Sequence, residues 1–164
     1  HLLDVGGGVG AIHHELLDAG LYAATHVDAS EAYIAVARRE TEKRGHGDRT
    51  RFVAGDFVTV ASEVPEADIV TLDRVICCYG DMESLVRASA GKAQRLYGAV
   101  FPRDHWYLEP AFGAINLWKR VTGSRFRVFL HPASAIDAAI RRQGFRRRNL
   151  VRTFVWNVAL YERA

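Results

Sequence analysis

The sequence predicts an α/β fold in which a mostly parallel β-sheet packs against helices. Three observations support this class. Short apolar runs alternate with helix-like segments over most of the chain. A glycine-rich turn, Gly6–Gly10, directly follows the first apolar run. Two strand-like runs end the chain with too few residues between them for a crossover helix, so we expect an antiparallel hairpin.

The first half of the chain carries the first three predicted strands. The run Leu2–Val5 is apolar except for Asp4, and the segment after the glycine turn has apolar residues at helical spacing. Ser30 is a candidate N-cap, because its hydroxyl can accept a hydrogen bond from the first turn of a helix. The expected elements are strands at residues 2–5, 23–28 and 51–54 and helices at residues 11–19 and 30–44.

The second half continues the alternation and ends in the hairpin. The apolar run around Val70 indicates a buried parallel strand. Pro102 is expected to stop the fifth strand, and Pro132 to take the first position of the last helix, which ends before Gly144. The expected elements are strands at residues 67–75, 95–101, 145–151 and 154–161 and helices at residues 82–90, 112–121 and 132–143.

Composition narrows the class of protein. The chain has 164 residues, of which 49% are hydrophobic and 25% charged, as is typical of one globular domain. We expect neither a membrane span nor a signal peptide, because no apolar run is long enough and no basic segment precedes the first one. The adjacent residues Cys77 and Cys78 disfavour a structural disulfide and fit a reducing, cytoplasmic location.

The positive charge lies mainly late in the chain, and the net charge is +3. Arg141-Arg142 and Arg146–Arg148 are compatible with an anionic partner such as nucleic acid. No basic motif with interleaved aromatic residues accompanies them, so a charged edge strand is the favoured interpretation. A nucleic-acid partner is therefore not expected.

The glycine turn predicts a ligand site. Gly6, Gly8 and Gly10 allow the backbone to turn tightly and to approach a ligand, and the following helix has unpaired N–H groups at its start. Asp4 lies just before the turn. A carboxylate at the mouth of this loop would repel a phosphate but attract a ligand with a positive group.

Acidic residues end four of the predicted parallel strands: Asp4, Asp28, Asp56 and Asp73. The carboxyl ends of parallel strands meet at one edge of the sheet, where right-handed crossovers leave a crevice. We therefore expect the four carboxylates to converge on one site.

These motifs resemble those of the class I S-adenosylmethionine-dependent methyltransferases of the bacterial small-molecule type. Asp4-Val-Gly-Gly-Gly-Val-Gly10 is similar to the first motif of that family, and Asp28 to the acid that binds the ribose hydroxyls. Gly55-Asp56-Phe57 resembles the motif whose acid bonds the adenine amino group and whose next residue packs on the ring. Asp73 and Arg74 match the motif beside the methionine end of the cofactor.

The resemblance implies S-adenosyl-L-methionine as the cofactor and methyl transfer to a small organic acceptor. It also implies a Rossmann-like three-layer αβα sandwich whose seven strands have the order 3-2-1-4-5-7-6, with strand seven antiparallel. The implied cofactor-binding residues are Asp4, Gly6, Gly8, Gly10, Asp28, Ala29, Asp56, Phe57, Asp73 and Arg74.

The resemblance covers essentially the whole chain, so residues 1–164 are expected to form one cofactor-binding domain. In this family, segments before the first strand often cover the cofactor and shape the acceptor pocket. The chain begins directly in an apparent strand, so we expect this domain to lack that lid segment.

Two alternative functions remain open at this point. Gly6, Gly8 and Ala11 also fit a dinucleotide-binding frame, in which an acid about 20 residues on, here Asp28, is expected as well. That frame would indicate an NAD(P)-dependent oxidoreductase. The third possibility is a non-catalytic domain that binds the cofactor or serves as a scaffold. Asp4, Gly10, the Asp56-Phe57 pair and the terminal hairpin favour the methyltransferase.

The candidate catalytic residues follow the fourth and fifth predicted strands. Methyl transfer is an in-line displacement, for which orientation supplies most of the rate enhancement. A general base is needed only where the acceptor must lose a proton, and the candidates are His105, His131 and Tyr79. Trp106 and Trp118 are expected to pack in the core or in a lid.

No metal site is predicted. His13 and His14 are adjacent on a predicted helix, where successive side chains project from different sides and do not share a ligand.

Overall fold

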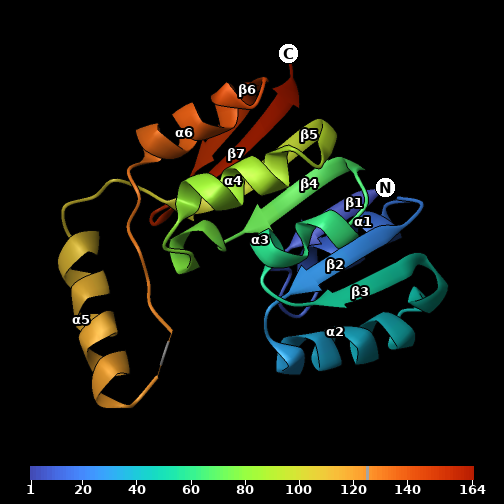
Figure 1. Cartoon of the computed structure of the whole chain (residues 1–164), viewed down its shortest axis with the longest axis horizontal. Helices are drawn as coiled ribbons and strands as arrows, with labels where there is room; N and C mark the ends of the chain where they lie inside the picture. Colours follow the sequence, from blue (N-terminus) through green and yellow to red (C-terminus); the bar gives the residue numbers. More distant parts are fainter. Residues whose placement is uncertain (125) are drawn as a thin grey trace.

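A computed structural model describes residues 1–124 and 126–164, and its centre is a seven-stranded sheet of order β3-β2-β1-β4-β5-β7-β6 (Figure 1). β1 to β5 are parallel and β7 is antiparallel to both β5 and β6, so the predicted sheet order and direction are confirmed. The strands are β1 (Leu2–Val5), β2 (Ala24–Asp28), β3 (Thr50–Ala54), β4 (Ala67–Asp73), β5 (Ala93–Pro102), β6 (Phe145–Arg152) and β7 (Trp156–Arg163). The helices are α1 (Ala11–Asp18), α2 (Glu31–Lys43), α3 (Phe57–Val60), α4 (Met82–Ala90), α5 (Leu108–Val121) and α6 (Ala133–Arg142).

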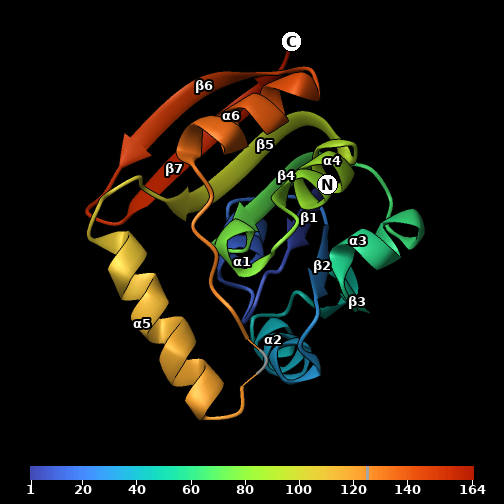
Figure 2. The same ribbon diagram turned by 60° about the vertical axis from the view of Figure 1, so that its left-hand side comes forward.

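Helices cover both faces of the sheet, as the predicted αβα class requires. α3, α4 and α6 contact one another over one face, and α1 and α2 contact β1, β2 and β3 from the other (Figures 1 and 2). β1 lies between β2 and β4, and its four residues are all buried. This burial on both faces explains why a four-residue run suffices to mark the central strand.

Several predicted boundaries are wrong, each because of one backbone feature. β4 ends at Asp73, two residues early, because Arg74 has a φ of +59°, which no strand accommodates. α5 begins at Leu108 rather than at residue 112, because Pro110 lies in the first helical turn, where its missing N–H is not needed. Pro132 is the N-cap rather than the first residue of α6.

The hairpin partners also differ from the prediction at their ends. β5 extends through Pro102, which pairs with Trp156 at the last position of the ladder, where a missing N–H costs least. β7 begins at Trp156 rather than at Phe154, because residues 153–156 form a turn. In this turn the Thr153 N–H donates to the Trp156 carbonyl, and the Thr153 hydroxyl accepts from the Trp156 N–H.

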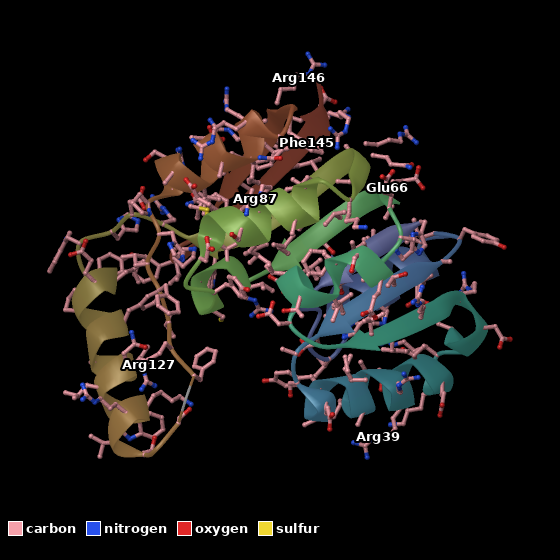
Figure 3. The ribbon with its side chains drawn as sticks, in the orientation of Figure 1. Arg39, Glu66, Arg87, Arg127, Phe145 and Arg146 are labelled. Carbon is pink, nitrogen blue, oxygen red and sulfur yellow. The ribbon has the colours of Figure 1, made fainter. Side chains whose placement is uncertain are left out.

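The late arginines belong to the charged edge strand that the sequence favoured. β6 is an outer strand, and Arg146, which points away from the body of the protein in Figure 3, forms an ion pair with Glu162. Arg148 binds the same carboxylate, and Arg147 binds Asp137 of α6. These residues are therefore largely neutralised by neighbours within the domain.

α5 stands apart from the layers (Figures 1 and 2). Leu108 is its only buried residue, and Trp118 is 63% exposed. Trp106, just before the helix, is 83% exposed, so neither tryptophan packs in the core, and a position in a lid remains the other part of the prediction. Even α5, within the described part of the chain, lacks the length and apolar character of a membrane-spanning helix.

The glycine turn offers a direct test of this backbone. Gly6 and Gly8 have φ values of +63° and +56°, but a Cβ at Gly6 would lie 2.4 Å from Val75 Cγ2, whereas one at Gly8 meets open space. Gly6→Ala should lower the free energy of unfolding by roughly 2–4 kcal/mol, because strain and overpacking add. Gly8→Ala should cost only about 1–2 kcal/mol from backbone strain. Urea denaturation measures both, and equal losses would contradict the assigned contact with Val75.

Candidate functional site

The turn between β1 and α1 is built from glycines in left-handed conformations. Gly6, Gly8 and Gly10 all have positive φ, and Gly6 N–H donates a hydrogen bond of 2.7 Å to the Val27 carbonyl. The space where a Gly8 side chain would lie is open. The turn is thus fixed to β2 on one side and leaves room for a ligand on the other.

Asp28 ties the end of β2 to this turn. Its Oδ2 accepts a hydrogen bond of 2.9 Å from Gly8 N–H, and its Oδ1 accepts one of 2.8 Å from Ser30 N–H. The residue is 9% exposed, and Ala29 beside it is exposed. Each carboxylate oxygen keeps a further lone pair, so the group can still accept hydrogen bonds from a diol.

Asp4 lies beneath the turn, not at its mouth as expected. The residue is 0% exposed, and its Oδ1 accepts a hydrogen bond of 2.7 Å from the Thr71 hydroxyl. A Cβ on Gly7 would lie 2.5 Å from Asp4 Oδ2, so the carboxylate sits directly behind the loop backbone. It therefore acts on a ligand through its field and through the loop rather than by contact.

Asp56 lies at the end of β3, where it caps α3. Its Oδ1 accepts a hydrogen bond of 2.9 Å from Val58 N–H, and the Tyr79 hydroxyl donates to the same carboxylate at 3.1 Å. Burial, together with this carboxylate, raises the pKa of Tyr79. Phe57 is 5% exposed and belongs to the main hydrophobic core, so little of its ring is accessible to a ligand.

Asp73 ends β4 and pairs with the residue after it. Arg74 Nε and NH2 donate to the Asp73 carboxylate at 3.1 and 2.8 Å, and this hydrogen bonding raises the pKa of Arg74. The Arg74 carbonyl accepts hydrogen bonds from the thiols of Cys77 and Cys78. The left-handed conformation of Arg74 thus turns the chain away from the sheet edge and presents the Asp73 carboxylate there.

The four acids do follow neighbouring strands, but they differ in accessibility. β3, β2, β1 and β4 are consecutive in the sheet. Asp56 is exposed, Asp73 has 22% of its side chain exposed, Asp28 is nearly buried, and Asp4 is fully buried. The accessible edge therefore consists of three carboxylates and the glycine turn, with the fourth acid behind it.

Two of the three catalytic candidates come together. His131 Nε2 donates a hydrogen bond of 2.8 Å to the Tyr79 carbonyl, which leaves Nδ1 of this histidine as its free acceptor. His105 lies elsewhere, stacked on Tyr107 with ring centroids 5.0 Å apart. It lines a cavity of about 560 Å³ between α5 and the segment 128–132. That volume is typical of a small-molecule site.

Two side chains of this cavity make contacts that the sequence did not predict. Asp104 accepts hydrogen bonds of 2.9 and 3.1 Å from Ala133 N–H and so caps α6, whose own N-cap, Pro132, has no side-chain acceptor. Asn116 of α5 donates to and accepts from the backbone of Val128 at 2.7 and 2.8 Å. The only signal in the sequence for the contact of Asp104 with α6 was Pro132. Because proline has no side-chain acceptor, the first N–H of the helix needs an acceptor from another segment.

Comparison with known proteins decides the family. The family described as methyltransferase domain matches residues 3–92. The chain belongs to this family. The resemblance to the class I S-adenosylmethionine-dependent methyltransferases is thereby confirmed, and S-adenosylmethionine is the cofactor that this family uses.

A relative of known activity supports the assignment of this methyltransferase domain. This relative is 3-amino-4-hydroxybenzoate 4-O-methyltransferase of Streptomyces cremeus, to which the chain is 37% identical over 87 residues. The match covers 49% of this chain but only 21% of that protein. The domain thus spans a small part of the length of this relative.

Solved structures show the same fold. Magnesium protoporphyrin IX methyltransferase from Synechocystis PCC 6803 with bound SAH has a TM-score of 0.77 and 20% identity, over 99% of this chain and 74% of that one. An O-methyltransferase family protein from Burkholderia thailandensis has a TM-score of 0.81 and 17% identity, over 99% and 50%. At these identities the likeness concerns the fold.

The cap supplied by Asp104 can be tested by matched variants. Asp104→Ala should lower the free energy of unfolding by about 1 kcal/mol, because the first N–H of α6 loses its acceptor. Asp104→Asn keeps a capping oxygen and should stay within a few tenths of a kcal/mol of the unaltered chain. Urea denaturation of the three proteins measures this, and equal losses for Ala and Asn would show that charge rather than capping matters.

Proposed function

We propose that this methyltransferase domain binds S-adenosyl-L-methionine and transfers its methyl group to a small organic acceptor. The observation that carries the proposal is the Asp28 carboxylate, held by Gly8 N–H and Ser30 N–H at the edge of the sheet. A carboxylate fixed beside an open glycine turn is the acceptor that a ribose diol requires. The family membership supplies the identity of the cofactor.

The proposed cofactor site follows the three accessible carboxylates. Asp28 with Ala29 would hold the ribose, Asp56 the adenine amino group, and Asp73 with Arg74 the methionine end. Gly6, Gly8 and Gly10 would bring the backbone against the ligand, where the open space at Gly8 supports a close approach. Asp4 would add negative potential from behind the loop, which favours a cationic ligand.

The hydride-transfer alternative fits this site less well. A dinucleotide would place its pyrophosphate on the glycine turn, where the buried Asp4 carboxylate lies directly behind Gly7. In a partly desolvated site this charge repels a phosphate. The scaffold alternative is also disfavoured, because Asp28 and the glycine turn are in place to bind a ligand.

When bound, the cofactor would supply a methyl carbon activated by its sulfonium sulfur: the bond from the acceptor to this carbon would form as the carbon–sulfur bond breaks, and the sulfur would leave as the thioether of the demethylated product. The remaining task of the protein is to orient the acceptor and to remove its proton where necessary. We assign the base to His105, which lines the cavity beside α5. The hydrogen bond from His131 to the Tyr79 carbonyl would hold together the two segments that lie between the cofactor site and that cavity.

The acceptor class follows from the relative and the cavity. The relative of known activity is named for methylation of a hydroxyl on an aminohydroxybenzoate, and the cavity beside α5 carries Trp106 and Phe112 together with Asp104 and Glu109. A small aromatic acceptor with a hydroxyl group fits such mixed walls. We propose a cytoplasmic location, which the free Cys77 and Cys78 thiols support.

Calorimetry tests the cofactor. Asp28→Ala should weaken binding of S-adenosylmethionine or its demethylated product about 100-fold, because two charge-assisted hydrogen bonds to the ribose are lost. Asp48→Ala is the control: this exposed acid precedes the first residue of β3, whereas the proposed site lies at the last residues of the strands. The dissociation constant should not change. Melting temperatures measured in parallel separate loss of the loop from loss of contact. Preferential binding of NADH would contradict the proposal.

Methyl-transfer kinetics test the base. With 3-amino-4-hydroxybenzoate as the first acceptor probe, His105→Gln should lower kcat by about 10²–10⁴-fold without changing cofactor affinity. His131→Gln keeps a donor for the Tyr79 carbonyl and should have a much smaller effect. An unchanged kcat in His105→Gln would assign proton removal to another group or to water.

A further inference from the structure

A row of polar side chains lies buried between the sheet and α1, behind the glycine turn. Thr71, Asp4 and His26 are register partners on β4, β1 and β2, so their side chains share one face of the sheet. His13 of α1 contacts this row, with its Nδ1 beside Asp4 and His26. Asp4, His13 and His26 are each 0% exposed, although aspartate and histidine are rarely buried without a partner.

Three ligand-type atoms of this row face one another. Asp4 Oδ2 lies 3.6 Å from His13 Nδ1 and 4.0 Å from His26 Nδ1, and the two nitrogen atoms are 3.1 Å apart. The centre of a triangle with these sides lies about 2.1 Å from each corner, which is the length of a Zn–N or Zn–O bond. The three atoms are therefore already spaced as ligands of one ion.

Hydrogen bonding within the described residues leaves one of these three atoms without a partner. Asp4 Oδ2 has no donor among them, and a buried carboxylate oxygen without a donor is costly. A proton between the two Nδ1 atoms satisfies the histidines but leaves that oxygen unmatched. A cation at the centre would accept all three lone pairs at once.

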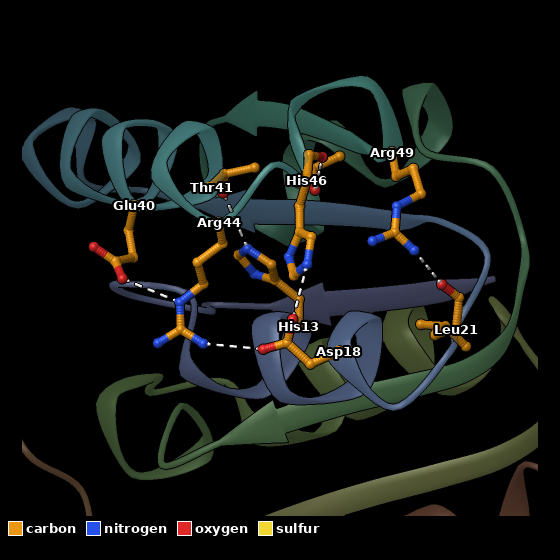
Figure 4. Close-up of polar contacts among 9 residues, drawn as sticks. His13, Asp18, Leu21, Glu40, Thr41, Arg44, His46 and Arg49 are labelled. Atoms are coloured by element: carbon orange, nitrogen blue, oxygen red, sulfur yellow. Dashed lines mark hydrogen bonds and ion pairs between the residues drawn. The ribbon is translucent and has the colours of Figure 1, made fainter.

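The surroundings orient the ligands. Asp4 Oδ1 is bound by the Thr71 hydroxyl at 2.7 Å, and His13 Nε2 lies 3.4 Å from Thr41 Oγ1 on α2, a contact drawn in Figure 4. Partners of this kind fix the ring and carboxylate orientation of metal ligands in proteins. The Gly7 backbone packs directly against the cluster, because a Cβ there would lie 2.5 Å from Asp4 Oδ2 and 2.6 Å from His26 Nδ1.

We propose that Asp4, His13 and His26 form a structural binding site for a divalent cation of the Zn²⁺ type. Two imidazole nitrogens and one carboxylate oxygen suit zinc and its first-row neighbours better than Mg²⁺ or Ca²⁺, which prefer oxygen ligands alone. The ion would join β1, α1 and β2 directly beneath the glycine turn, where its charge would offset the negative potential that the proposed function assigns to Asp4. The prediction of no metal considered only the spacing of His13 and His14 along one helix and could not include partners from two strands.

Metal analysis of the chain without a polyhistidine tag tests the site. After removal of metal and incubation with ZnCl₂, mass spectrometry should find a single Zn²⁺ per chain, and the melting temperature should rise with zinc concentration. His26→Gln removes a ligand and should weaken zinc binding by about 100-fold or more, because loss even of a group that only orients a ligand costs up to about 100-fold. His14→Gln is the matched control, because His14 is equally buried beside His13 but lies outside the triad.

Equal affinity of the unaltered chain and His26→Gln, or an equal loss in His14→Gln, would overturn the proposal, as would absence of stoichiometric zinc. Zinc-edge X-ray absorption of the unaltered chain gives a second measurement that needs no folded variant. It should show imidazole and oxygen ligands only. Sulfur in the first shell would place the ion at Cys77 and Cys78 and would also overturn the site. None of these measurements requires cofactor binding, so the outcome is separate from that of the proposed function.

Discussion

The hydrogen bond from Gly8 N–H to the Asp28 carboxylate is the contact on which the site depends. It joins the glycine turn to the end of the neighbouring strand and holds the loop where α1 can begin. The left-handed backbone of Gly6, Gly8 and Gly10 makes this geometry possible, since a side chain at Gly6 or Gly10 would collide with Val75 or His13. Burial of the Asp28 carboxylate keeps its charge unscreened at the sheet edge.

The layer behind the turn links the stability of the fold to the properties of the site. Asp4 is in register with Thr71 and His26, so a row of polar side chains crosses three neighbouring strands of an otherwise apolar core. Burial lowers the pKa of His26 to about 4, and the same cause lowers that of His14 to about 4, so both rings are neutral near pH 7.

The region after β5 has a different physical character. α5 has little buried surface, and polar contacts connect this region to the rest: Asn116, in the middle of α5, binds Val128, and Asp104, before the helix, binds the start of α6. A helix with few apolar contacts has a low free energy of local unfolding, and segments that bind ligands commonly have this property. The core of the domain, by contrast, contains the buried residues of β1, β4, β5 and α4.

The sequence by itself determined the order of elements, the sheet class and the glycine turn. Alternating apolar runs, Gly6–Gly10 and an acid after each early strand are local signals, because each depends on neighbours along the chain. Tertiary structure decided which acids face a ligand: Asp4 is buried although its motif resembles that of an exposed site, and Phe57 enters the core. It also brought His13 to His26 and His131 to Tyr79. Such contacts arise from strand register and helix packing between distant segments, and no local pattern encodes them.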